Sequence, residues 1–123
     1  MSKEFRVAIV GGRDFNDYPR LRHHVDTMLF NKVQQGYKIV VLDGGARGAD
    51  ALGKQYAQER GYEICTHAAD WDRHGKSAGY RRNEAMSDDA DAIIAFWDQK
   101  SRGTAHMIRY SQSRNKSIRV FTY

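Results

Sequence analysis

The stretch that decides the fold is Phe5-Arg6-Val7-Ala8-Ile9-Val10-Gly11-Gly12, a mostly apolar run that stops at two glycines. A short run rich in β-branched residues and closed by glycine predicts a buried strand. The next segment, 18–35, predicts an amphipathic helix because its apolar residues recur at helical spacing. These residues are Leu21, Val25, Met28, Leu29 and Val33. A strand, a glycine turn and a helix form the repeating unit of α/β proteins.

The same unit recurs along the chain. Further strands are predicted at 39–42, 62–66, 92–97 and 118–121, and further helices at 49–57, at about 81–87 and from Gly103-Thr104 onward. A polar loop is predicted from His67 to about Gly79. Strands that alternate with helices need right-handed crossovers, which produce a mostly parallel sheet covered on both faces. We therefore expect one Rossmann-like α/β domain over residues 1–123, with a five-stranded sheet in the order 3-2-1-4-5.

Composition agrees with an ordered domain. The 123 residues are 41% hydrophobic, and 20 Lys and Arg against 15 Asp and Glu give a formal charge of +5. This excess is compatible with anionic partners that range from a nucleotide phosphate to a nucleic-acid strand. The single cysteine, Cys65, predicts a small core residue, and His23 and His24 are expected on the surface. Because no signal peptide or membrane-length apolar run is evident, we expect a cytoplasmic protein without a membrane partner.

Three loops concentrate the unusual residues. In a parallel α/β sheet, ligands bind beyond the carboxyl ends of the strands where the strand order reverses, here between the first and fourth strands. Glycines allow close backbone approach, helix N-terminal amides attract anions, and arginines add positive charge. The expected ligand-binding residues are Gly11, Gly12, Arg13, Asp14 and Phe15, then Gly44, Gly45, Ala46, Arg47, Gly48 and Asp50, and finally Ser101, Arg102, Gly103 and Thr104. No Walker A or GxGxxG motif is present, which disfavours P-loop NTPases and ordinary dehydrogenases.

The segment between Asp70 and Asn83 mixes charged and aromatic residues and is expected to wall the same pocket. From it, Asp70, Trp71, His74, Arg82 and Asn83 join the expected ligand-binding residues. Trp71 either stacks on a base or packs under the loop. Asp70, Asp72 and His74 are too few for a hard-metal site, so we expect neither a metal nor a cofactor.

Five short motifs resemble the YspA-type, YpsA-related branch of the SLOG superfamily. They are Gly11-Gly12-Arg13-Asp14-Phe15, the segment 44–50, the segment 69–76, Arg82-Asn83 with Met86, and Arg102-Gly103-Thr104. The superfamily also contains the Lonely Guy phosphoribohydrolases and the DprA/Smf proteins. The resemblance implies a Rossmann-like fold and a nucleotide-derived ligand, with the glycine and Gly-Thr loops holding phosphate or ribose.

One position departs from the Lonely Guy pattern. Those enzymes carry GGxGTxxE after the fourth strand, and here Met107 stands where the glutamate would be. A thioether cannot act as a proton carrier or stabilise an oxocarbenium-like centre. If the chain is a hydrolase, its acid or base must come from elsewhere, and the candidates are Asp70, Asp72, His74 and Glu84.

Three functions therefore remain open. The first is binding or sensing of a phosphorylated nucleotide or nucleotide-derived small molecule. The second is hydrolysis of an N-glycosidic or phosphate bond in such a ligand, and the third is single-stranded nucleic-acid binding like that of DprA. A homodimer is also expected, with Tyr80, Tyr110 and Met107 as candidate interface residues.

Overall fold

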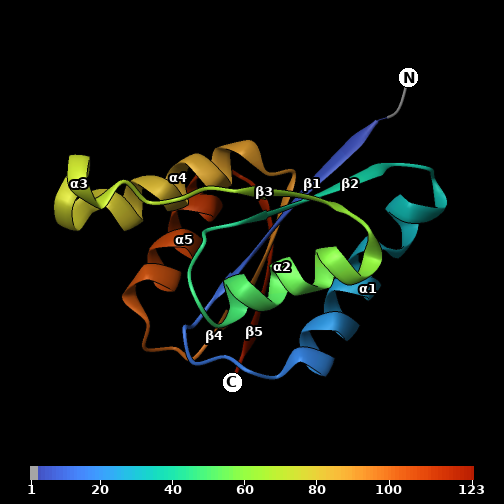
Figure 1. Cartoon of the computed structure of the whole chain (residues 1–123), viewed down its shortest axis with the longest axis horizontal. Helices are drawn as coiled ribbons and strands as arrows, with labels where there is room; N and C mark the ends of the chain where they lie inside the picture. Colours follow the sequence, from blue (N-terminus) through green and yellow to red (C-terminus); the bar gives the residue numbers. More distant parts are fainter. Residues whose placement is uncertain (1–2) are drawn as a thin grey trace.

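The computed structural model describes residues 3–123, and its centre is a five-stranded sheet in the order β3-β2-β1-β4-β5 (Figure 1). The strands are β1 (Glu4–Gly11), β2 (Lys38–Asp43), β3 (Glu63–Thr66), β4 (Ala92–Trp97) and β5 (Ser117–Thr122). All four neighbouring pairs run parallel. The predicted fold class and strand order are confirmed.

Helices cover both faces of this sheet, as expected for parallel strands joined by crossovers. They are α1 (Tyr18–Gln34), α2 (Ala49–Arg60), α3 (Trp71–His74), the 3₁₀ turn η1 (Gly75–Ser77), α4 (Ala78–Asp89) and α5 (Arg102–Ser113). Buried residues of α1 and α2 pack on one face, and those of α4 and α5 pack on the other (Figure 1). The chain changes face when it crosses from β3 to β4, which leaves the reversal of strand order between β1 and β4.

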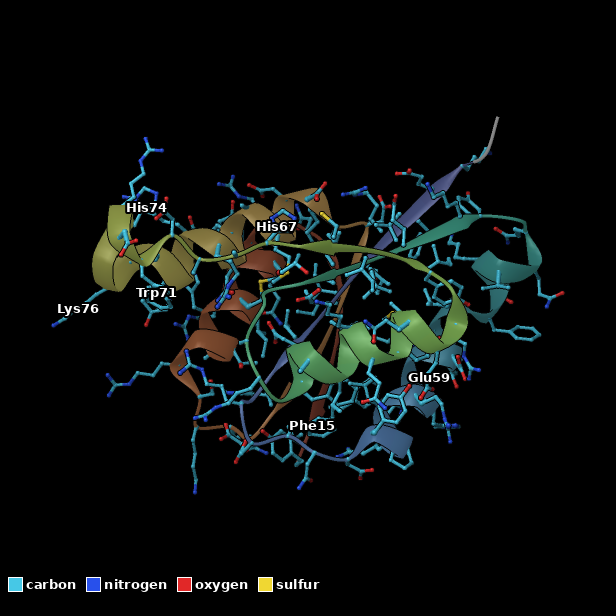
Figure 2. The ribbon with its side chains drawn as sticks, in the orientation of Figure 1. Phe15, Glu59, His67, Trp71, His74 and Lys76 are labelled. Carbon is cyan, nitrogen blue, oxygen red and sulfur yellow. The ribbon has the colours of Figure 1, made fainter. Side chains whose placement is uncertain are left out.

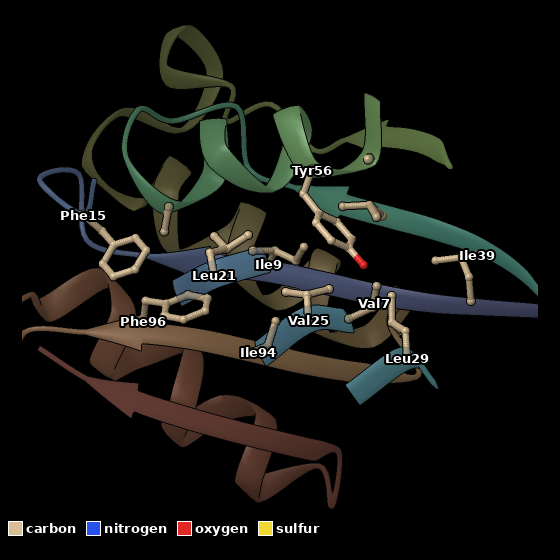
Figure 3. Packing of buried hydrophobic residues seen from close by; sticks show 13 residues of the cluster. Val7, Ile9, Phe15, Leu21, Val25, Leu29, Ile39, Tyr56, Ile94 and Phe96 are labelled. Carbon is tan, nitrogen blue, oxygen red and sulfur yellow. The ribbon is translucent and has the colours of Figure 1, made fainter. Parts of the chain in front are cut away.

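The core under α1 and α2 includes a residue that the sequence analysis assigned to ligand binding. Phe15 is only 3% exposed, and its ring stacks on Phe96 with centroids 4.6 Å apart (Figure 3). A turn in which the Phe15 N–H donates to the Gly12 carbonyl at 3.2 Å precedes α1, and the Phe15 side chain packs in the core. His23 is exposed as expected, whereas His24 is only partly exposed, because its ring stacks on Phe121 of β5 with centroids 3.8 Å apart.

The predicted polar loop from His67 to Gly79 is wrong over most of its length. The Asp70 carboxylate accepts the backbone N–H of Arg73 at 3.1 Å and so caps α3. Gly75 ends α3 with φ +56°, and α4 then begins at Ala78 instead of near residue 81. A side-chain cap therefore starts a helix where the composition favoured a loop.

Other expected positions are corrected by burial. Met107 is 1% exposed within the core under α4 and α5, so it cannot serve as a dimer contact. Cys65 only borders that core, because β3 is an edge strand. Tyr80 is 42% exposed, and the homodimer stays a prediction.

Within residues 3–123, every helix is too short or too polar to cross a membrane.

Two of the glycine loops touch each other. The Ala49 N–H donates to the Gly12 carbonyl at 3.1 Å, and the Gly12 N–H donates to the Phe96 carbonyl at 3.0 Å. Gly48 adopts φ +77°, and a Cβ there would overlap the backbone of Gly12 and Arg13. The approach of the β1–α1 and β2–α2 loops therefore requires glycine at position 48.

We predict that Gly48→Ala lowers the free energy of unfolding by about 1–3 kcal/mol more than Gly75→Ala does. Gly75 is a matched control because it has a similar backbone conformation, φ +56° and ψ −132° against φ +77° and ψ −130°, with open space at its Cβ. Urea unfolding of both variants measures the difference. Equal losses would show that the loops do not need their close contact.

Candidate functional site

A cavity of about 390 Å³ opens at the carboxyl ends of β1 and β4, at the reversal of strand order. Three strand-to-helix loops and α4 contribute to it. Its lining residues are Val10, Gly11, Gly12, Arg13, Asp14, Ala46, Asp50, Arg82, Asn83, Asp98, Ser101, Gly103, Thr104 and Met107. The loops that the sequence analysis singled out thus meet at one place.

A second cavity of about 460 Å³ adjoins the first, because Arg13, Ala46 and Arg82 line both. Its other lining residues are Gly44, Gly45, Arg47, Ala68, Ala69 and Trp71. Among residues 3–123, no carboxylate lines this cavity, whereas the first has three. Trp71 is 52% exposed on α3 (Figure 2), so an aromatic face is available beside three arginines.

Arg82 joins the elements that enclose the two cavities. Its guanidinium donates to the Gly44 carbonyl through Nη1 and to Asn83 Oδ1 through Nε at 2.9 Å. Asn83 in turn donates from Nδ2 to the Gly103 carbonyl at 3.1 Å. Residues of α4 therefore link the β2–α2 loop to the first turn of α5. Burial lowers the pKa of Arg82, and the nearby Asp50 carboxylate opposes that shift.

Asp50 holds the other side of the same glycine. Its Oδ2 accepts the Gly44 N–H at 2.9 Å, and the residue is 5% exposed. Burial raises the pKa of Asp50 to about 6, while the positive charge of Arg82 and the Gly44 N–H act in the opposite direction. A carboxyl group that titrates near neutral pH therefore lines the first cavity.

The rim of the first cavity is polar. Asp98 accepts the backbone N–H groups of Lys100 and Ser101, each at 2.8 Å, and Ser101 caps α5. Asp14 accepts the hydroxyl of Tyr123 at 2.5 Å. Asp98 is not among the residues predicted from the sequence, although it follows the fourth predicted strand as the other loop residues follow theirs. It had no signal for Tyr123, which lies 109 positions from Asp14.

The four catalytic candidates from the sequence do not meet at the site. Within the described chain, Asp70, Asp72, His74 and Glu84 line neither cavity. Asp70 caps α3, and Glu84 lies 3.2 Å from His106 Nε2. His74 ends α3, and Figure 2 shows it at the outer tip of the molecule. Besides Asp70 and His74, three expected ligand-binding residues lie outside the cavity linings, namely Phe15, Gly48 and Arg102.

We predict that the wild type loses stability relative to Asp50→Asn as the pH rises from about 4 to about 6. In that window the unfolded chain releases the Asp50 proton while the folded chain still holds it, so deprotonation favours unfolding. The full effect is about 3 kcal/mol, of which roughly 1–2 kcal/mol falls between about pH 5 and about pH 7.5. Urea unfolding of both proteins at these two pH values measures it, and parallel pH profiles would contradict it.

Comparison with known proteins identifies the family. The profile of the YspA, cpYpsA-related SLOG family matches residues 5–74, which is more than half of the chain. The chain is also 38% identical over 114 residues to the Gene 61 protein of Mycobacterium phage D29, covering 87% of this chain and 88% of that protein.

Two solved structures share the fold. One is DNA processing protein A from Helicobacter pylori, studied for its single-stranded DNA binding, with a TM-score of 0.70 and 20% identity. The similarity covers 96% of this chain, but this chain spans only 65% of that protein. The other is TM1055, with a TM-score of 0.60 and 19% identity over 96% of this chain and 72% of that one. The fold, the glycine loops and the sequence matches agree: the chain belongs to the YspA, cpYpsA-related SLOG family.

Proposed function

We propose that the chain binds or senses a phosphorylated nucleotide or a nucleotide-derived small molecule across the two adjoining cavities. The observation that carries this proposal is the placement of Arg13 and Arg82 along both cavities, with Arg47 in the second. Guanidinium groups bind phosphate oxygens through charge-assisted hydrogen bonds. A phosphate at the shared boundary would neutralise these cations, and family membership supports nucleotide or nucleic-acid binding in general.

The remaining groups suit the rest of a nucleotide. Asp14 and Asp98 in the first cavity offer carboxylate oxygens that accept hydrogen bonds from ribose hydroxyls. The exposed ring of Trp71 in the second cavity offers a surface on which a base can stack. Thr104 and Ser101 add hydroxyl groups at the start of α5, where helix amides favour anions.

We predict that Arg13→Ala weakens binding of adenosine monophosphate by roughly 1.5–3 kcal/mol, because Arg13 borders both cavities. Arg47 lines the second cavity but not the first, so Arg47→Ala should weaken binding only if the ligand reaches the second cavity. Calorimetry measures both, with Arg119→Ala on β5 as an exposed control that lines neither cavity. Mass spectrometry of small molecules released from the purified protein identifies the natural ligand.

Unchanged affinity in both Arg13→Ala and Arg47→Ala would remove the proposed phosphate site. Single-stranded nucleic acid is the second candidate, favoured by the three arginines and the exposed Trp71 of the second cavity. Stacking of bases on aromatic rings beside basic groups is the usual mode for such strands. An oligonucleotide that binds more tightly than adenosine monophosphate, with steep salt dependence and loss in Trp71→Ala, would favour this candidate.

Hydrolysis of the ligand is a third candidate with a narrower basis. Met107, at the position of the Lonely Guy glutamate, borders the first cavity although it packs in the core under α4 and α5. The carboxyl groups in that cavity are Asp14, Asp50 and Asp98, not the candidates proposed from the sequence. Of these, Asp50 has the raised pKa that a general acid requires.

We predict no release of free base from adenosine monophosphate at a rate comparable to the Lonely Guy enzymes. Removing a carboxylate that stabilises an oxocarbenium-like transition state costs several kcal/mol, and each 1.4 kcal/mol is about tenfold in rate. Binding should persist, because Arg13 and Arg82 act independently of Met107. Chromatography of the reaction and calorimetry on the same preparation test the two halves together.

Robust turnover would contradict the binding proposal if it survived in Met107→Ala and was abolished in Asp50→Asn or in Asp98→Asn. That result would define an enzyme with a relocated carboxylate. Turnover that persisted in all three variants would point to a contaminating hydrolase, and repurification to constant specific activity separates these outcomes.

A further inference from the structure

A thiol, an imidazole and a carboxylate meet on the α4 side of the sheet, outside both cavities. They belong to Cys65 in β3, His67 just after β3, and Asp89 at the end of α4. One ligand-type atom from each lies within 4.8 Å of the other two. Figure 2 shows His67 beside the α4 ribbon, well away from the labelled Trp71.

His67 and Asp89 are held in place by hydrogen bonds, and Cys65 is positioned by strand β3. His67 Nε2 lies 3.1 Å from Asp89 Oδ2, and the His67 backbone N–H donates to the Asp43 carbonyl at 2.8 Å. Arg6 donates from Nη2 to Asp89 Oδ2 at 2.7 Å and from Nε to the Asp89 carbonyl at 3.2 Å. Residues far apart in the chain are therefore fixed next to one another before any ligand arrives.

We propose that Cys65, His67 and Asp89 form a zinc site with a fourth position open to water or another ligand. A thiolate, an imidazole and a carboxylate are the three ligand types that Zn²⁺ takes in proteins, whereas Mg²⁺ and Ca²⁺ take oxygen ligands. Bonds of about 2.0–2.3 Å place neighbouring ligand atoms of a tetrahedral zinc roughly 3–4 Å apart. The distance of 3.1 Å between His67 Nε2 and Asp89 Oδ2 already lies in that range, and the other separations, at most 4.8 Å, would have to close to it when the metal binds.

The coordination chemistry is simple. Cys65 binds as a thiolate and releases its proton to solvent, while His67 binds as the neutral imidazole. Arg6 acts as a positioning residue, because a hydrogen bond to a ligating carboxylate orients it toward the metal. Bound zinc would connect the edge strand β3 to the end of α4. The other half of α4 carries Arg82 and Asn83, so the metal would steady the helix that links the loops of the nucleotide site.

Titration with Co²⁺ and Zn²⁺ under a non-thiol reductant tests the proposal. We expect one Co²⁺ per chain, with sulfur-to-cobalt charge-transfer absorption that stoichiometric Zn²⁺ displaces. Cys65→Ser should abolish that absorption, and His67→Gln and Asp89→Asn should each weaken Zn²⁺ binding by about tenfold or more. His23→Gln, an exposed histidine on α1, is the matched control and should bind like the wild type.

Circular dichroism of each variant confirms that it is folded before its affinity is interpreted. If Cys65→Ser or Asp89→Asn fails to fold, His67→Gln alone decides, since His67 is partly exposed. The proposal is overturned if the cobalt spectrum lacks sulfur charge transfer, if Zn²⁺ binds equally well after His67→Gln, or if the stoichiometry is far below one.

Discussion

The backbone of Gly44 is held from both sides by side chains of opposite charge. Asp50 accepts its N–H, and Arg82 donates to its carbonyl oxygen. Asp50 is buried and Arg82 is half-buried, so each charge depends on the other and on its hydrogen bonds. This arrangement fixes the β2–α2 loop against α4, and through Asn83 and Gly103 it fixes α5 as well. The shape of both cavities depends on it.

The topology explains why these groups meet where they do. Strands β1 to β3 progress outward on one side of the sheet and β4 and β5 on the other, so the loops after β1 and β4 diverge to opposite faces. The space between them is the first cavity, and the β2–α2 loop and α4 extend it into the second. Carboxylates gather in the first cavity and arginines extend through the second. A ligand with hydroxyl groups at one end and phosphate beside an aromatic ring fits this division of charge.

Much of this arrangement could be predicted from sequence patterns, and the failures have physical causes. Parallel strands buried on both faces leave continuous apolar runs, and glycine turns follow them, so the strand order and the three loops were predicted. Spacing within a loop does not say which way a side chain points, so Phe15 was assigned to the ligand although it packs on Phe96. Local hydrogen bonding overrode composition at Asp70, which caps a helix in a segment predicted to be a loop.

The sequence by itself determined the alternation of strands and helices, the family, and the glycine and arginine residues that reach the carboxyl edge of the sheet. These properties follow from periodicity and from local backbone requirements, which act between near neighbours. Only the tertiary structure decided that Arg82 reaches Gly44, that Tyr123 meets Asp14, and that Asp89 lies beside Cys65. Those partners are 38, 109 and 24 positions apart along the chain. Crossover geometry and packing alone bring them into contact.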